Sequence, residues 1–284
     1  MLQLLGTVFA ALLGLAFGSF LNVCLSRWPE GESVVTPRSH CRICDRPLAW
    51  WENIPLLSWL MLRGNCRTCK TWIGMRYPIV EAAVGLAWAL IAWHAYQVLF
   101  PLEFAVGMMI LAWALVGLAV LDAEYLWLPD AITLPSIGLG LCWWFIRDVH
   151  VRWALHTASA PGQDFKLVGL RLLGVVAAAG LILLIRWVYT LVRHREGIGL
   201  GDAKLLAMLA AWLGFPSALL SFCLGVVLGA LFSLVVLAFP AARRDPESWA
   251  LSKLPLGTFL CIGGIVSSLW GQPIIAAYLR WAGL

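Results

Sequence analysis

The chain has 284 residues, of which 62% are hydrophobic and 12% are charged, and its mean hydropathy is +0.86. This apolar content is well above the roughly 45–50% of an ordinary soluble domain and excludes that class. The formal net charge of +5 is small and divided among loops, so it does not indicate nucleic acid as a partner. The composition predicts an all-α polytopic protein whose partner is the lipid bilayer.

Eight apolar stretches predict about eight transmembrane helices, because a span needs about 20 apolar residues. The first lacks a basic leader region and a small-residue cleavage site, so we expect a retained span rather than a signal peptide. The sixth is short and is expected to be a partial or tilted span that ends at Gly214-Phe215-Pro216. The stretches are Leu2–Leu25, Pro78–Phe100, Leu102–Leu121, Ala131–Ile146, Leu167–Val192, Leu205–Gly214, Ala218–Phe239 and Leu256–Leu279.

Basic residues predict which loops face the cytosol. The loop between the first two spans holds the largest basic concentration, which the positive-inside rule places inside: Arg27, Arg38, Arg42, Arg46, Arg63, Arg67, Lys70 and Arg76. Counting spans from there also places Asp122–Asp130, Arg193–Lys204 and Ala241–Lys253 inside, and Arg147–Lys166 outside. Both termini are then predicted to be periplasmic.

The loop between the first two spans is expected to be a small domain, which divides the chain into 1–25, 26–77 and 78–284. It contains two C-x-x-C motifs, a spacing typical of a four-thiolate zinc site: Cys41, Cys44, Cys66 and Cys69. Four thiolates leave no open coordination position, so zinc would be structural and would supply folding free energy. Two disulfides are the alternative, which a cytosolic location disfavours.

Two aspartates at the cytosolic ends of separate helices are candidate catalytic residues. Asp122 ends the third span, and Asp202 opens the sixth after glycines 197, 199 and 201. Paired carboxylates that share one proton can hydrolyse a peptide bond, one as base and the other as acid. Gly199 and Gly201 would let an extended substrate backbone approach Asp202.

The acidic residues near these helix ends also have structural explanations. Asp122 and Asp202 can be interfacial helix-end charges, with Asp202 as an N-cap. Glu124 and Asp130 compete within the first cluster, and Asp130 is better explained as the cap of the fourth span. Glu81, at the start of the second span, either supports the site or the cofactor, or pairs with Arg76.

Taken together, the motifs resemble those of the prepilin peptidases, or type IV leader peptidases, over almost the whole chain. The resemblance rests on Gly18–Val23 with Arg27–Pro29, Cys41–Tyr77 with Trp51–Leu56, Arg76–Glu81, Asp122 with Leu128–Asp130 and Thr133–Pro135, Gly199–Asp202 with Lys204, and Pro255–Gly257.

The resemblance implies a bifunctional enzyme of the bacterial inner membrane with its active site facing the cytosol. It would cleave the basic leader of type IV prepilins and type II secretion pseudopilins with Asp122 and Asp202. It would then N-methylate the new N-terminal residue, usually phenylalanine, with S-adenosylmethionine. Glu52 and Asn53 are candidates for the methyl-donor site, with turn formation as the alternative, while Glu81 and Lys204 would support the site.

Two other classes of protein are consistent with parts of the sequence. An ion-coupled transporter would use the two aspartates as proton relays, but it favours acids near the midplane and an inverted repeat between the halves. A non-enzymatic assembly factor would bind partners through the cysteine motifs. In that case alanine at Asp122 would be harmless, and alanine at Cys41 would not.

Overall fold

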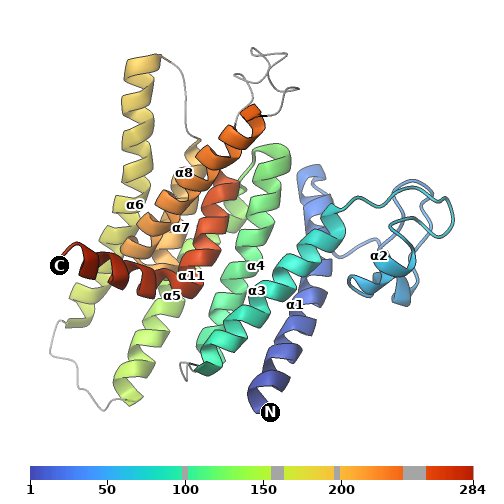
Figure 1. Cartoon of the computed structure of the whole chain (residues 1–284), viewed down its shortest axis with the longest axis horizontal. Helices are drawn as coiled ribbons and strands as arrows, with labels where there is room; N and C mark the ends of the chain where they lie inside the picture. The colour runs from blue at the N-terminus through green and yellow to red at the C-terminus, as the bar shows by residue number, and fades with distance from the viewer. Residues whose placement is uncertain (98–101, 155–162, 195–198, 239–253, 284) are drawn as a thin grey trace. The chain divides into compact units, whose positions relative to one another are not determined.

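The computed structural model describes residues 1–97, 102–154, 163–194, 199–238 and 254–283. Each of the eight predicted apolar stretches coincides with a helix (Figure 1). These are α1 (Leu2–Arg27), α3 (Arg76–Gln97), α4 (Leu102–Tyr125), α5 (Asp130–Ala154), α6 (Gln163–Arg193), α7 (Leu200–Leu213), α8 (Phe215–Ala238) and α11 (Leu256–Trp281). The predicted all-α membrane fold is confirmed.

Six of these helices are long and apolar enough to cross a membrane, so the count of eight spans was approximate. The two others are α5 and α7. Helix α5 has 25 residues, but Pro135 lies inside it and charged residues follow Ile146. Helix α7 has 14 residues and is therefore about 21 Å long at about 1.5 Å per residue, which is less than the hydrocarbon thickness.

The chain forms two compact units, residues 1–117 and 118–284. In the first unit, α1 and α3 lie side by side. Glycines make this close approach possible: a Cβ at Gly18 would lie 2.7 Å from Cα of Glu81, and a Cβ at Gly14 would lie 2.9 Å from Cα of Gly85. Small residues spaced by four are typical of closely packed membrane helices.

The loop between α1 and α3 contains the short helices η1 (Trp28–Glu30), η2 (Trp50–Asn53) and α2 (Leu57–Met61). Its two C-x-x-C segments have the same backbone pattern. Cys41 N–H donates to Arg46 C=O at 2.9 Å, and Cys66 N–H donates to Thr71 C=O at 2.8 Å. Each turn has one residue with positive φ, Asp45 in the first and Lys70 in the second.

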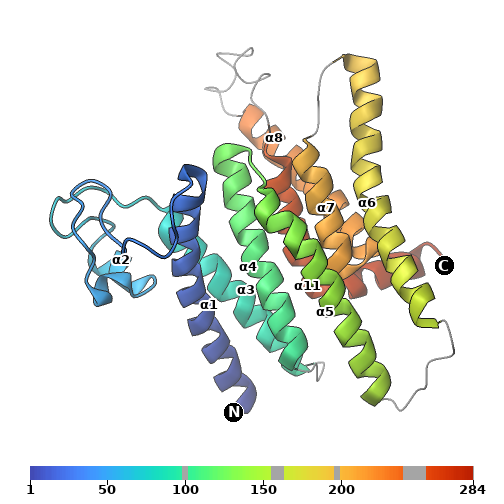
Figure 2. The ribbon, with the colours of Figure 1, turned by 180° about the vertical axis from the view of Figure 1, so that it is seen from behind.

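In the second unit, α7 packs against α5, α6, α8 and α11 (Figure 2). Nearly all of its side chains from Asp202 to Trp212 are buried, which explains how so short a helix tolerates an almost wholly apolar sequence. It is held at its C-terminal end by the Trp212 indole, which donates to Ser136 C=O at 2.8 Å.

Some predicted features lie outside the described residues. These are the loop 241–253, glycine 197, and parts of the predicted connections 147–166 and 193–204. The predicted division into 1–25, 26–77 and 78–284 stays a prediction.

Candidate active site and metal centre

Asp122 lies in the last turn of α4 and is 6% exposed. Its Oδ2 accepts hydrogen bonds from Thr258 N–H at 2.7 Å and from the Thr258 hydroxyl at 3.2 Å. Thr258 belongs to the first turn of α11, where backbone N–H groups lack partners within the helix. The N-terminus of α11 therefore fixes the orientation of the Asp122 carboxylate.

Gly257 explains how this contact is possible. A Cβ at Gly257 would lie 2.9 Å from both Cγ and Oδ2 of Asp122, closer than side chains approach one another. The Pro255-Leu256-Gly257 motif thus brings the α11 backbone directly against the carboxylate.

Asp202 is the third residue of α7 and is 8% exposed. Its Oδ2 accepts a hydrogen bond from Gly199 N–H at 3.2 Å. The side chain thus reaches back to the N-cap backbone, so part of the expected capping role is present, from the third position of the helix and not from the cap itself.

The two aspartates come together in the second unit. The Asp202 carboxylate lies within electrostatic range of Asp122. Leu128 packs between Gly257, which adjoins the Asp122 carboxylate, and Gly201, which precedes Asp202, because its Cδ1 would lie 3.0 Å from a Cβ at Gly257 and 3.1 Å from a Cβ at Gly201. Two residues 80 positions apart in sequence thereby share one buried site, as a carboxylate pair requires.

The other acids of the first cluster are placed differently. Asp130 and Glu124 are exposed. Lys204, predicted to support the site, forms an ion pair with Asp130. This pair links the start of α5 to the second turn of α7, two residues after Asp202.

The glycines before and beside Asp202 have different surroundings. A Cβ at Gly201 would lie 3.1 Å from Cβ and Cδ1 of Leu128, so its small size serves internal packing. Gly199 donates to Asp202, and the nearest atom to a Cβ there would be Asp202 Oδ2 at 3.4 Å. The predicted approach of a substrate backbone at these glycines stays a prediction.

The four cysteines of the first unit converge. Their Sγ atoms all lie within 4.8 Å of one another, and Cys41 Sγ is 3.7 Å from Cys69 Sγ. A tetrahedral zinc ion with Zn–S bonds of about 2.3 Å needs sulfurs about 3.8 Å apart, so this cluster fits such an ion. All four cysteines are free, and the two-disulfide alternative is not adopted.

The thiols of the cluster differ in their pKa values. The pKa of Cys44 is raised to about 11, because the lowering effect of the hydrogen bond with the Arg46 backbone is outweighed by burial and by hydrogen bonds with the other three thiols, whereas the pKa values of Cys66 and Cys69 are lowered. Hydrogen bonding by the Thr71 side chain, whose hydroxyl lies 3.4 Å from Cys69 Sγ, lowers the pKa of the Cys69 thiol to about 6. The thiolate is the form that binds metal. The predicted ligands Cys41, Cys44, Cys66 and Cys69 could therefore hold a structural zinc ion, with no position left for substrate.

Glu52 and Asn53 lie in η2, beside the cluster. Both Glu52 oxygens are engaged, because Arg46 binds them at 2.7 and 3.0 Å and Ala49 N–H donates at 2.7 Å. The Arg46 guanidinium accordingly lowers the pKa of the buried Glu52 carboxyl. This arrangement favours the turn-forming alternative for Glu52, while Asn53 is exposed.

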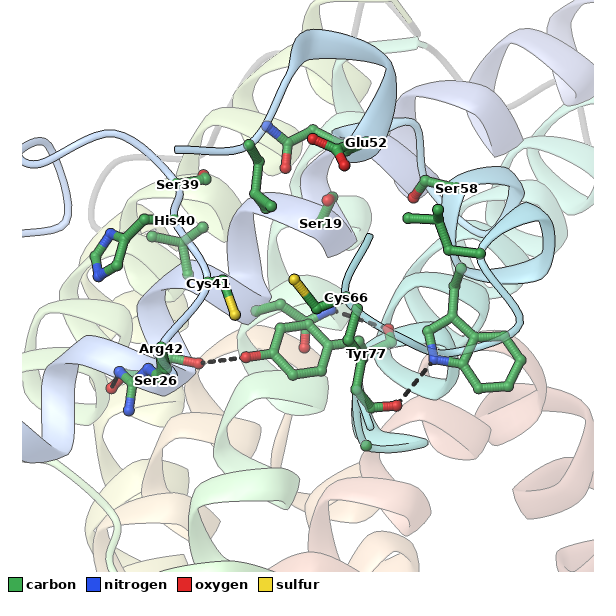
Figure 3. Close-up of a pocket in the computed structure, with 18 of the residues that line it drawn as sticks. Ser19, Ser26, Ser39, His40, Cys41, Arg42, Glu52, Ser58, Cys66 and Tyr77 are labelled. Atoms are coloured by element: carbon green, nitrogen blue, oxygen red, sulfur yellow. Dashed lines mark hydrogen bonds between the residues drawn. The ribbon is translucent and has the colours of Figure 1, made fainter. Parts of the chain in front are cut away.

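A cavity of about 930 Å³ lies within the first unit, between the cysteine loop and the α1–α3 pair (Figure 3). Its wall includes Cys41, Cys66 and Glu52 from the loop, and Ser19 and Tyr77 from the helices. Glu81 and Asn22 line it as well. The volume is within the range of about 300–1,000 Å³ typical of small-molecule sites.

The sequence analysis assigned no role to three residues that shape these sites, Thr258, Leu128 and Asn22, although Leu128 and Asn22 lie within the motifs Leu128–Asp130 and Gly18–Val23. Thr258 follows the Pro-Leu-Gly motif directly, so that motif pointed to the right segment without indicating that a backbone N–H would bind Asp122. Asn22, a polar residue within the first apolar span, carried the signal that buried polar groups in membrane helices usually carry.

The fold and the two sites define a polytopic membrane protein with a buried pair of carboxylates and a small four-thiolate domain. Residues 12–95 match the bacterial peptidase A24 N-terminal domain, and residues 109–234 match the type IV leader peptidase family. No solved structure matches the chain.

Relatives that match the chain carry the name prepilin leader peptidase/N-methyltransferase, among them three from Stutzerimonas and Pseudomonas. The protein of Stutzerimonas stutzeri is 35% identical over 97% of this chain and 94% of its own length. That of Pseudomonas aeruginosa is 36% identical over 96% of this chain and 93% of its own, and that of Pseudomonas putida is 34% identical over 96% and 94%. The chain belongs to the type IV leader peptidase family, and it is a multi-pass membrane enzyme with peptidase character.

Proposed function

We propose that the chain cleaves the leader peptides of type IV prepilins and type II secretion pseudopilins, with Asp122 and Asp202 as the catalytic pair. The observation that carries the proposal is their burial together. Among the described residues of the second unit, these two are the buried acids, and they interact electrostatically although they belong to different helices. Burying two carboxylates is costly, so a site that does so calls for a chemical reason.

The mechanism follows from one proton shared by two close carboxylates. The ionised aspartate removes a proton from water, the water oxygen attacks the scissile carbonyl carbon, and the protonated aspartate donates to that carbonyl. Collapse of the tetrahedral intermediate then releases the leader from the amine of the mature protein, which takes up a proton. Thr258 holds the Asp122 carboxylate and Gly199 N–H holds that of Asp202, so neither has to be ordered when substrate binds.

The location that fits this chemistry is the bacterial inner membrane, with the carboxylates at the cytosolic face. A basic leader stays in the cytosol while the apolar helix that follows it lies in the bilayer. The cleavage site would then lie at the interface, where helix α4 ends and helix α7 begins.

We also propose that the chain N-methylates the newly exposed N-terminus and that the cavity of the first unit is where this occurs. When bound, S-adenosylmethionine would supply an electrophilic methyl group. The printed names of the relatives include N-methyltransferase, and the cavity of about 930 Å³ is roomy and lined by both polar and aromatic side chains. The four-cysteine cluster would fix the loop that forms its outer wall.

Leader cleavage in membranes tests the catalytic pair. Asp122→Asn and Asp202→Asn keep side-chain size and remove ionisation, so each is expected to lower the cleavage rate of a prepilin by at least about 100-fold. Asp130→Asn is the matched control, because this exposed acid of the same cluster pairs with Lys204 and should retain cleavage. Near-normal cleavage by either test variant would show that the pair is misassigned.

A further inference from the structure

The inner wall of the first-unit cavity carries two buried hydrogen-bond acceptors. Asn22 on α1 is 2% exposed, and Glu81 on α3 is 7% exposed. Both line the cavity. Ser19 and Asn22 are one turn apart on α1, and Tyr77 and Glu81 are one turn apart on α3, so each pair lies on a single helix face.

The Asn22 amide is only half satisfied. Its Nδ2 donates to Tyr77 C=O at 2.9 Å, which fixes the orientation of the amide because a carbonyl cannot accept from Oδ1. Its Oδ1 is buried and has no hydrogen-bond partner. An unsatisfied buried acceptor costs about 1–3 kcal/mol, so its presence beside a cavity indicates that something else donates to it.

The Glu81 carboxylate also has capacity to spare. Leu56 N–H donates to its Oε2 at 2.8 Å, and the Ser19 side chain interacts with it. A carboxylate has about four lone-pair sites, so these partners leave room for further donors. The close approach of α1 at Gly18 holds the Glu81 backbone in place.

Three cationic side chains of the cavity wall already have hydrogen-bond partners, and a fourth, Arg67, stacks on Trp51 with its guanidinium carbon 5.3 Å from the ring centroid. Arg27 donates to the carbonyls of Ser33 and Pro37, Arg42 pairs with Glu30, and Arg46 pairs with Glu52. The cavity therefore offers open acceptors on its inner wall, while these donors are engaged elsewhere. A complementary ligand would bring a positively charged group that carries hydrogen-bond donors.

We propose that Asn22 and Glu81 form a binding site for a primary ammonium group. The proposal rests on the methyl transfer proposed above, which involves two such groups. One is the α-ammonium of the newly cleaved N-terminus, and the other belongs to the amino-acid part of S-adenosylmethionine. An ammonium presents three donors, enough to satisfy Asn22 Oδ1 and the Glu81 carboxylate together.

Binding of two ligand pairs to the full-length protein in nanodiscs tests the site without requiring turnover. The first pair is a short peptide that begins with free phenylalanine and its N-acetylated form. The second is S-adenosylhomocysteine and its N-acetyl form. Wild-type protein is expected to prefer the free amine in one of the pairs by about tenfold or more, the effect of one hydrogen bond to a charged group.

Glu81→Gln and Asn22→Leu are each expected to remove most of that preference. Glu32→Gln, which makes the same charge change at an exposed position of the cavity wall, should retain it. Retained leader cleavage would show that each variant is still inserted, and unchanged protease resistance of the loop between α1 and α3 would show that its first unit is still folded.

The outcomes separate the two ligand sources and the two proposals. Preference in the peptide pair assigns the site to the acceptor amine, and preference in the nucleoside pair assigns it to the methyl donor. Absence of any preference in wild type, or its persistence in both Glu81→Gln and Asn22→Leu, would overturn the ammonium site. A wild type that discriminates but never methylates a cleaved substrate would instead contradict the proposed methyl transfer and leave the ammonium site standing.

Discussion

The carboxylate pair and the cysteine cluster are built by different means. In the second unit, Asp122 and Asp202 are presented by regular helices and oriented by backbone N–H groups at helix starts, so helix packing alone forms the site. In the first unit, the cluster and the outer wall of the cavity belong to a loop held by turns, short helices and the four sulfurs. The carboxylate pair should therefore be sensitive to steric change, and the cysteine cluster should be sensitive to loss of metal.

The two sites also differ in how fully their buried polar groups are hydrogen-bonded. The aspartates of the second unit have close neighbours, and Gly257 leaves no space beside Asp122. The first unit encloses a large cavity with an unsatisfied acceptor. A tightly packed site suits a reaction in which only water and one peptide bond must be placed, whereas an open cavity suits a bulky soluble ligand.

Loss of metal is the largest expected effect on the cysteine loop. Cys41→Ser removes one of four thiolates, so zinc content should fall from about one ion per chain to almost none, because structural zinc sites need all four ligands. The loop between α1 and α3 should then become sensitive to protease. Metal analysis and limited proteolysis of the purified protein would measure this.

Cys142→Ser is the matched control, since Cys142 is an exposed cysteine outside the cluster and its loss should leave zinc content unchanged. A Cys41→Ser protein that keeps full zinc content and protease resistance would contradict a four-thiolate site.

A steric change should have the next largest effect, in the second unit. In Gly257→Ala the new Cβ would meet Cγ and Oδ2 of Asp122 at 2.9 Å, so the carboxylate or the start of α11 has to move. A displacement of about 1 Å at a catalytic group can cost about 100-fold in rate, and we expect a loss of leader cleavage of that order. Rates measured with a saturating prepilin substrate would report it.

Gly180→Ala supplies the control for Gly257→Ala. Gly180 lies within α6, and a Cβ there would meet no atom within 4 Å. This change should leave cleavage intact, because alanine also favours the helix. Equal activity of the two variants would mean that the Asp122–α11 contact is not needed.

The Arg46–Glu52 pair is expected to have a smaller and pH-dependent effect on the loop. The pKa of Glu52 is lowered by Arg46, so the pair adds stability above the unfolded pKa of about 4.3, and that stability is lost as the pH falls through the lowered value. Glu52→Gln should lower the denaturation temperature of the loop at pH 7, and the difference from wild type should shrink below about pH 4.

Proteolysis of the loop during a thermal ramp, repeated at several pH values, measures that difference. Asp45→Asn is the control, because Asp45 is an exposed acid of the same loop and asparagine accepts its positive φ. A difference that grows on acidification would have the wrong sign and would rule out the pair as the cause.

The sequence predicted features that depend on local pattern. Hydropathy located the eight long helices of the described residues, and the C-x-x-C spacing predicted four converging sulfurs, because both signals are contained in short segments. The features that the sequence did not predict depend on contacts between segments that are distant in the chain. The burial of α7 depends on the four helices that surround it, and the binding of Asp122 by Thr258 joins residues 136 positions apart.

The contacts within the candidate sites likewise could be predicted only in part. Asp122 and Asp202 could be selected from helix ends and motifs, but Lys204 could not be assigned to Asp130, since that pair depends on how α5 meets α7. Glu52 looked available as a ligand in the sequence, whereas folding occupies both its oxygens with Arg46 and Ala49. The unsatisfied Oδ1 of Asn22 becomes visible only when its other amide atom has a partner.

The smallest expected effect distinguishes packing from substrate contact at Gly201. In Gly201→Ala the new Cβ would lie 3.1 Å from Leu128, a flexible side chain that can yield by a few tenths of an ångström. If Gly201 serves packing alone, the cleavage rate should fall only a few-fold, and Gly201→Ala combined with Leu128→Ala should recover part of the loss, because the second change removes Cδ1 and Cγ of Leu128 and leaves its Cβ. If a substrate backbone instead passes against Gly201, the loss would persist in the double variant and would appear as a raised KM, so kinetics of the two single variants and the double variant separate these roles.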